Sequence, residues 1–189
     1  MSSFPLYLLR HGEPEGAGRL IGLTDAPPIA AGIAACADQA RNLAAEVLIA
    51  SDLSRARLAG EAIALATGVP LSIDPRWREL DFGAWDGMAP GDVEGAALAR
   101  FWDDPDGHAP PGGERWSALV ERVSSALGDL AARPTLIVTH GGAMRAALAV
   151  LCGFDMHQTW AVDLPYNCLL TLRVWPGATP TAQIAGLYP

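Results

Sequence analysis

Short apolar runs alternate with segments of helical periodicity along this chain. Six runs have the length and the apolar composition of buried strands, namely residues 5–10, 47–50, 71–74, 135–139, 168–175 and 181–187. Four stretches carry helix signals and predict helices over residues 31–45, 51–67, 114–132 and 143–151. We expect residues 75–108 to be irregular and residues 107–113 to form a loop. The alternation predicts an α/β sandwich with a largely parallel central sheet.

Two histidines directly follow predicted strands. His11 comes after the strand that ends at Arg10, and His140 comes after the strand that ends at Thr139. In parallel sheets, functional sites gather beyond the carboxyl ends of the strands. Although the two histidines are 129 residues apart in sequence, the fold can therefore bring both to one edge of the sheet.

Length and charge narrow the class of protein. The 189 residues fit a single domain, spanning residues 1–189. The net charge is −8 and the basic residues form no run, which argues against nucleic acid as a partner. The longest apolar stretches, residues 43–50 and 143–153, are shorter than the roughly 20 residues that a membrane span needs, so no membrane association is expected. The N-terminus lacks the features of a secretory signal, which favours a cytoplasmic protein.

Cysteine and histidine spacing gives no indication of a metal site. Cys36, Cys152 and Cys168 form no CxxC pair, and His108 and His157 lack partners at the spacing of metal ligands. We therefore expect neither a metal nor another cofactor.

The tripeptide Arg10-His11-Gly12 combines three groups that suit phosphoryl transfer. A phosphoryl group in transit carries negative charge on its oxygens and needs fixed donors and positive charge. A guanidinium can grip two of these oxygens, a glycine lets the backbone approach closely, and an imidazole nitrogen can attack phosphorus. Taken alone, the same tripeptide is more typical of a surface arginine and a capped histidine that follows a strand than of a phosphate site.

Further segments in the same order make the pattern specific. They are residues 51–57, residues 78–87 with Glu79 and Asp81, residues 110–114, and residues 138–142 around His140. Together with residues 9–13, they resemble the histidine phosphatase superfamily, also called phosphoglycerate mutase-like, from Leu6 to about Leu151. The resemblance implies a three-layer α/β/α sandwich and a small phosphate ester as the partner molecule.

The resemblance also implies a role for each matching residue. His11 is the group that becomes phosphorylated, Arg10, Arg55 and His140 hold the phosphate, and Glu79 is the general acid. An alkoxide leaving group needs a proton, which a carboxyl group kept partly protonated by apolar neighbours such as Phe82 and Trp85 could supply. The residues expected to bind the substrate are Gly12, Thr24 and Gly141.

Several of these assignments have alternatives. Asp81 competes with Glu79 as the acid because it lies only two residues away, and His140 could instead cap the helix that follows it. Arg57 could bind phosphate, although its position on a helix favours a solvated or ion-paired arginine. His108 could lie over the substrate entrance.

Departures from the family pattern favour hydrolysis over transfer. Pro14 stands where the family usually has a hydroxyl residue, residues 15–18 lack the asparagine of the mutases, and Ala59 replaces a frequent threonine. The 61 residues from Glu79 to His140 contain few basic residues for a closed lid, namely Arg100, Arg115, Arg122 and Arg133. We therefore expect a phosphatase, and the alternatives are a cofactor-dependent phosphoglycerate mutase and a non-catalytic phospho-ligand binder.

The branch and the substrate are less well defined by sequence. Residues 18–25 and 111–114 resemble the α-ribazole phosphatases most closely. Tryptophans could stack on a ring-bearing substrate or pack in the core, and they are Trp77, Trp85, Trp102 and Trp116. The sequence leaves the oligomeric state open, a homodimer included.

Overall fold

The computed structural model describes residues 2–189, and a single sheet with the order β3-β2-β4-β1-β5-β6 runs through it. Its strands are β1 (Phe4–Arg10), β2 (Val47–Ala50), β3 (Leu71–Ile73), β4 (Thr135–Thr139), β5 (Leu169–Trp175) and β6 (Thr181–Tyr188). The pairs β1–β4, β4–β2 and β2–β3 are parallel, whereas β5 is antiparallel to both β1 and β6. The predicted strands and the largely parallel sheet are confirmed.

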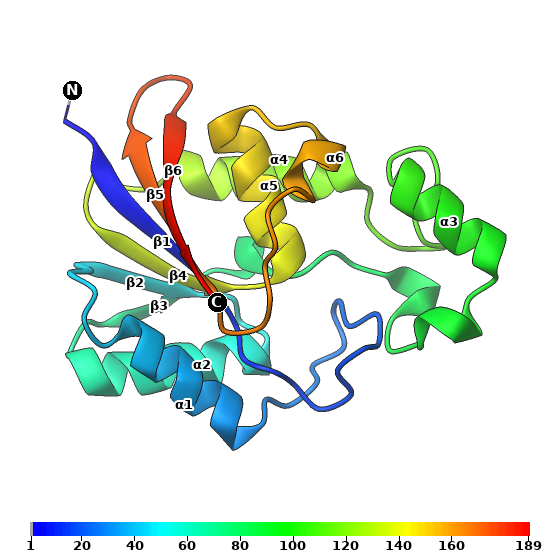
Figure 1. Cartoon of the computed structure of the whole chain (residues 1–189), viewed down its shortest axis with the longest axis horizontal. Helices are drawn as coiled ribbons and strands as arrows, with labels where there is room; N and C mark the ends of the chain where they lie inside the picture. Colours follow the sequence, from blue (N-terminus) through cyan, green and yellow to red (C-terminus); the bar gives the residue numbers. More distant parts are fainter. Residues whose placement is uncertain (1) are drawn as a thin grey trace.

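Helices cover both faces of this sheet, which confirms the predicted α/β/α layering. Figure 1 shows α1 (Ala30–Ala40) and α2 (Ser54–Thr67) below the sheet, and α4 (Trp116–Gly128) and α5 (Gly141–Cys152) above it. The remaining short elements are α3 (Gly95–Asp103), α6 (Met156–Thr159) and the 3-10 turns η1 (Pro75–Trp77), η2 (Gly83–Trp85) and η3 (Pro90–Asp92). In the part of the chain that the structure describes, no helix is long and apolar enough to cross a membrane.

The central strands are buried because both of their faces carry apolar side chains. Successive residues of a strand point to opposite faces, so Leu6 and Leu8 of β1 join the core under α4 and α5, whereas Leu9 joins the core under α1 and α2. Every residue of β4 is buried. This two-sided burial is typical of parallel strands covered by helices on both faces and explains why the pattern of β4 was so clear in the sequence.

A close backbone contact fixes the segment that leaves β1. A Cβ atom added at Gly12 would lie 2.4 Å from the backbone of Gly32 in α1. No side chain fits at this distance, so the absence of one at Gly12 allows the loop after β1 to pack directly on α1.

Several helices differ from the sequence-based expectation, and the helix predicted over residues 114–132 is shorter, Trp116–Gly128. The helix predicted over residues 31–45 ends at Ala40, where Arg41 N and Leu43 N donate to carbonyl oxygens three residues earlier and tighten the last turn. The segment predicted to be irregular contains α3, which begins where the Glu94 carboxylate accepts hydrogen bonds from the N–H groups of Ala96 and Ala97.

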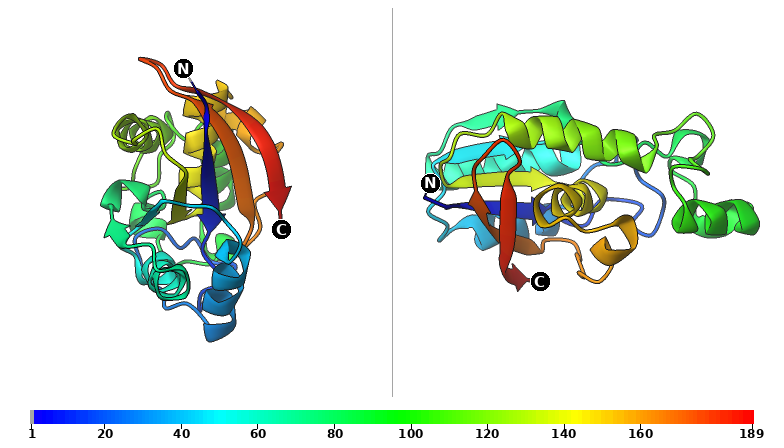
Figure 2. Two further views of the ribbon diagram at one scale, coloured as in Figure 1. Left: turned by 90° about the vertical axis from the view of Figure 1, so that its left-hand side faces the viewer. Right: turned by 90° about the horizontal axis from the view of Figure 1, so that it is seen from above.

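The position of α3 explains why its pattern was missed. In Figures 1 and 2 this helix lies at one end of the molecule, away from the sheet. Its apolar face is short and is made by Leu98, Phe101 and Trp102, of which only Phe101 is fully buried. The four-residue helix α6, held by a capping box between Asp155 and Gln158, was also not predicted.

We predict that Gly12→Ala lowers the free energy of unfolding by about 2 kcal/mol, because the new methyl group must push the loop away from α1. Urea denaturation measures the change. The matched control is Gly128→Ala, since a Cβ at this last residue of α4 meets no atom within 4 Å. Equal stability of the two variants would contradict the proposed close contact.

Candidate active site

The two histidines meet because their strands are neighbours. Arg10 of β1 lies opposite Thr139 of β4, and each histidine is the next residue of its strand. The His11 N–H donates to the Thr139 carbonyl at 2.8 Å. The two imidazole rings lie in an edge contact with their centroids 4.9 Å apart. The expectation that the fold brings His11 and His140 to one edge of the sheet is confirmed.

The backbone fixes the tautomer of His11. Its Nδ1 lies 2.6 Å from the Gly12 carbonyl oxygen, which can only accept a hydrogen bond, so Nδ1 carries the hydrogen and Nε2 keeps a free lone pair. Burial, with the nearby positive charges of Arg55 and Arg10, lowers the pKa of His11 from 6.5 to about 3. The ring is therefore neutral at pH 7, the state that a nucleophile requires.

His140 is completely buried beside His11. Its Nε2 shares a hydrogen bond of 2.9 Å with the Ser51 hydroxyl, and its Nδ1 has no hydrogen-bond partner among residues 2–189. Burial and the neighbouring His11 hold its pKa well below the usual value. His140 occupies the N-cap position of α5 without a side-chain capping bond, so the alternative that it caps this helix is wrong.

Two guanidinium groups line the cavity in front of His11. Arg55 is 1% exposed and donates to the carbonyl oxygens of Thr24 at 2.8 Å and of Gly22 at 2.6 Å. The Arg10 guanidinium lies 4.2 Å above the ring of Tyr166. Because both side chains are held by fixed neighbours, they can offer positive charge to an anion without reorganising.

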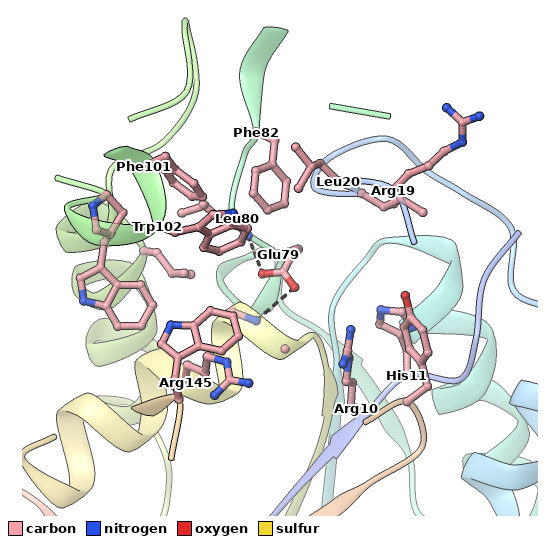
Figure 3. Close-up of a pocket in the computed structure, with 18 of the residues that line it drawn as sticks. Arg10, His11, Arg19, Leu20, Glu79, Leu80, Phe82, Phe101, Trp102 and Arg145 are labelled. Carbon is pink, nitrogen blue, oxygen red and sulfur yellow. Dashed lines mark hydrogen bonds between the residues drawn. The ribbon is translucent and has the colours of Figure 1, made fainter. Parts of the chain in front are cut away.

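Glu79 approaches the same cavity from the other side. Its carboxylate accepts hydrogen bonds from Leu80 N at 2.8 Å and from Gly142 N at 3.1 Å, drawn as dashed lines in Figure 3. A Cβ atom at Gly142 would lie 2.1 Å from Oε1 of Glu79, so only glycine allows the carboxylate to reach over the start of α5. These contacts fix the carboxyl group at the cavity that His11, Arg10 and Arg55 also line.

The cavity itself has a volume of about 270 Å³ and two chemically different ends. The polar end contains His11, Glu79, Gly141 and the arginines described above. The other end is apolar, and Figure 3 shows Phe101 and Trp102 there, on the far side of Glu79 from His11. The other large apolar residues that line the cavity are Leu20, Ile21, Leu80, Phe82, Trp116, Leu119, Met156 and Trp160.

Only one of the three predicted substrate-binding residues lines the cavity. Gly141 lines the cavity, and a Cβ atom there would be in ordinary van der Waals contact with the Arg10 guanidinium, 3.4 Å from its Cζ. Neither Gly12 nor Thr24 is among the described residues that line it. Gly12 contacts α1 as shown above, and Thr24 contributes its carbonyl oxygen to Arg55.

The competing candidates lie outside the cavity lining. Asp81 accepts a hydrogen bond from Gly83 N at 2.8 Å and stabilises the following turn. Arg57 forms an ion pair with Glu61 on the surface of α2, as its helical position indicated. His108 lies 3.6 Å from Asp104 and is not part of the cavity wall.

Sequence reasoning missed Ser51 as a site residue, although a signal for it was available. Ser51 directly follows β2, just as the two histidines follow β1 and β4, and its N–H donates to the Val138 carbonyl at 3.1 Å. The rule that placed the histidines therefore also places Ser51 at the site.

No feature of the sequence indicated that Tyr166 and Arg145 lie at the site. Tyr166 precedes β5, and its ring packs against His11 with centroids 5.5 Å apart as well as under Arg10. Arg145 of α5 lines the cavity and lies 3.8 Å over the ring of Trp160. Both positions depend on how separate segments pack. Among residues 2–189, no group of three or more His, Cys, Asp or Glu side chains is placed to hold a metal ion.

Comparison with known proteins agrees with this geometry. A protein of Enterobacter sp. (strain 638), named probable phosphoglycerate mutase GpmB, is 34% identical over 179 residues, which cover 88% of this chain and 82% of that protein. Mycobacterial glucosyl-3-phosphoglycerate phosphatase has a TM-score of 0.84 at 24% identity, covering 97% of each chain. The α-ribazole phosphatase of Shigella flexneri has a TM-score of 0.83 at 24% identity, covering 98% of this chain and 96% of its own.

The two structural likenesses establish the fold, and the sequence match establishes the family. The family model of the histidine phosphatase superfamily (branch 1) matches residues 6–184, nearly the whole chain. This protein belongs to the histidine phosphatase superfamily, branch 1.

Proposed function

We propose that this protein is a metal-independent phosphomonoesterase that hydrolyses a small phosphorylated metabolite through a phosphohistidine on His11. The observation that carries the proposal is the hydrogen bond from His11 Nδ1 to the Gly12 carbonyl, because it leaves the lone pair on Nε2. This buried, neutral imidazole lines a cavity that is also lined by Arg10, Arg55 and the carboxyl group of Glu79.

The reaction proceeds in two displacements at phosphorus. Nε2 of His11 forms a bond to phosphorus as the ester P–O bond breaks, and Glu79 gives its proton to the leaving alkoxide. Glu79, now a carboxylate, then removes a proton from water, whose oxygen attacks phosphorus as the P–N bond breaks. Arg10 and Arg55 stabilise the charge on the phosphoryl oxygens in both steps, and Glu79 ends the cycle protonated again.

Phosphoglycerate mutase is the second candidate, because the relative at 34% identity carries that name. A mutase binds a small, doubly anionic substrate, whereas most of this cavity beyond its polar end is apolar. If the protein efficiently converts 3- to 2-phosphoglycerate, and 2,3-bisphosphoglycerate stimulates this conversion, then its main activity is that of a mutase and not hydrolysis. A screen of phosphorylated metabolites that includes α-ribazole phosphate tests the possible α-ribazole phosphatase activity, which the motifs near Thr24 favour.

His11→Ala should reduce hydrolysis of p-nitrophenyl phosphate by at least about 10³-fold, because the covalent route is lost. The assay is run with a chelator, and rapid quenching should trap a phosphorylated wild-type enzyme. His108→Ala, a histidine outside the cavity wall, is the matched control and should keep full activity. Equal rates for His11→Ala and the wild type, or strict dependence on a divalent ion, would refute the proposal. Absence of turnover in the wild type would favour a non-catalytic binder.

Glu79→Gln should slow hydrolysis of alkyl phosphates by about 10² to 10⁴-fold, because their poor leaving groups need the proton. Phosphorylation of His11 by p-nitrophenyl phosphate should change little, since nitrophenolate leaves without a proton. The control is Asp81→Asn, whose carboxylate lies outside the cavity wall. An equal loss with both substrates would mean that Glu79 does not act as the leaving-group acid.

The neutral His11 also predicts a pH dependence of stability. The unfolded chain takes up a proton on this histidine near pH 6.5, whereas the folded chain does so only at about pH 3, so stability falls as the pH falls between these values. Between pH 6 and pH 4, the free energy of unfolding of the wild type should fall by up to about 2.5 kcal/mol more than that of His11→Gln. Urea denaturation at both pH values measures these two losses. If the wild type and His11→Gln lose the same free energy of unfolding, His11 titrates normally in the folded protein.

A further inference from the structure

The apolar end of the cavity is walled by aromatic rings that contact one another in series. The ring centroids of Phe82 and Phe101 are 6.0 Å apart, those of Phe101 and Trp102 are 4.7 Å apart, and those of Trp102 and Trp160 are 5.6 Å apart. Trp116 also lines the cavity. The series extends from a phenylalanine close to Glu79 in sequence to two tryptophans at the surface.

We infer that the alcohol part of the substrate carries a planar, apolar aromatic ring, which binds against Trp102, Trp116 and Trp160. The inference rests on the proposed phosphomonoesterase function, since the ester bond at the polar end is what directs the alcohol part toward this wall. It assigns the site to phosphate esters whose alcohol part carries an aromatic ring rather than to phosphorylated sugars or hydroxy acids that lack one.

Exposure of the two outer tryptophans supports an aromatic ligand. Trp102 and Trp160 remain 41% and 51% exposed, although both line the cavity. An indole ring left in water loses the gain from apolar burial, and aromatic rings that pack edge-to-face or offset gain a further contribution beyond burial. A ring bound here would cover apolar surface that the protein itself leaves open.

The polar groups beyond the phosphate-binding end are few and partly engaged by the backbone. Among the described lining residues, the charged side chains beyond the phosphate-binding end are Arg19 and Arg145. Arg19 donates to the Gly87 carbonyl at 2.9 Å, and Arg145 donates to the carbonyl oxygens of Thr159 and Val162. Both guanidinium groups keep further N–H donors, but the surrounding wall is apolar. Sugar hydroxyls packed against that wall would give up water without equivalent partners, which is unfavourable.

The structure also separates Trp102 and Trp160 from the tryptophans that serve the core, whereas Trp116 both lines the cavity and packs against the core. Trp77 is fully buried, and its carbonyl accepts a hydrogen bond from the Thr139 hydroxyl below the site. Trp85 packs on Phe101 and is absent from the described cavity wall. The ring-binding tryptophans therefore come from α3, from the start of α4 and from the residue after α6, and Trp102 lies on a helix that the sequence did not predict.

The test compares two substrates whose leaving alcohols have similar acidity, 2-(1-naphthyl)ethyl phosphate and ethyl phosphate. Similar acidity makes the chemical step alike, so a difference in kcat/KM reports recognition of the ring. We expect the naphthyl ester to be preferred by about 30-fold or more, with glycerol 3-phosphate and 3-phosphoglycerate no better than ethyl phosphate. Trp102→Ala and Trp160→Ala should each raise KM for the naphthyl ester about tenfold and leave kcat/KM for ethyl phosphate unchanged.

Trp175→Ala is the matched control, because Trp175 is 39% exposed on β5 and absent from the described cavity wall. The ethyl phosphate rate of each variant shows whether its fold and its polar end are intact. Equal kcat/KM for the two esters, or a preference for the sugar and glycerate phosphates, would overturn the aromatic assignment while leaving the phosphatase function standing. Absence of hydrolysis with every ester would instead overturn the proposed function.

Discussion

The parallel pairing of β1 with β4 sets the positions of the groups on which the site depends. With Arg10 opposite Thr139, the next residue of each strand is a histidine, and the two imidazoles must lie side by side. The same sheet edge receives Ser51 from the end of β2. Because β1 and β4 are covered on both faces, these strand ends cannot shift without disrupting both layers of the core.

Burial at this edge leaves the His11 imidazole neutral, whereas the similarly buried Arg55 guanidinium stays charged. It keeps His11 neutral, so that its free nitrogen can react, and the bond to the Gly12 carbonyl selects which nitrogen that is. Arg55, by contrast, stays charged although it is 1% exposed, because backbone carbonyls of residues 21–24 surround its guanidinium. A neutral nucleophile beside fixed positive charge is the arrangement that a phosphate ester requires.

The two ends of the cavity come from different parts of the fold. The polar end is made largely by strand ends and the first turns of α2 and α5, which the sheet holds rigidly. The apolar end is made by α3, by the region of α6 and by connecting loops, which lie at the periphery of the sandwich (Figures 1 and 2). Such a division allows the phosphate chemistry to stay fixed while loops and short helices determine which ester is accepted.

The sequence by itself determined the strands, the largely parallel sheet and most of the reactive residues at the polar end of the cavity. Periodicity located β4, the strand-end rule located His11 and His140, and the ordered motifs pointed to Arg10, Arg55 and Glu79, all of which the structure places together. These features are local, because a strand buried on both faces and a residue that follows it are visible in a few consecutive positions.

Tertiary structure alone decided the remaining features. Tyr166, Arg145 and Trp160 reach the site only because distant segments pack against it, and Gly12 and Thr24 proved to contact α1 and Arg55 rather than the cavity. The helices α3 and α6 are short, and much of their surface is exposed, so their apolar patterns are weak. A short sequence window carries no information about such long-range contacts, whose energies depend on the assembled core and not on local propensity.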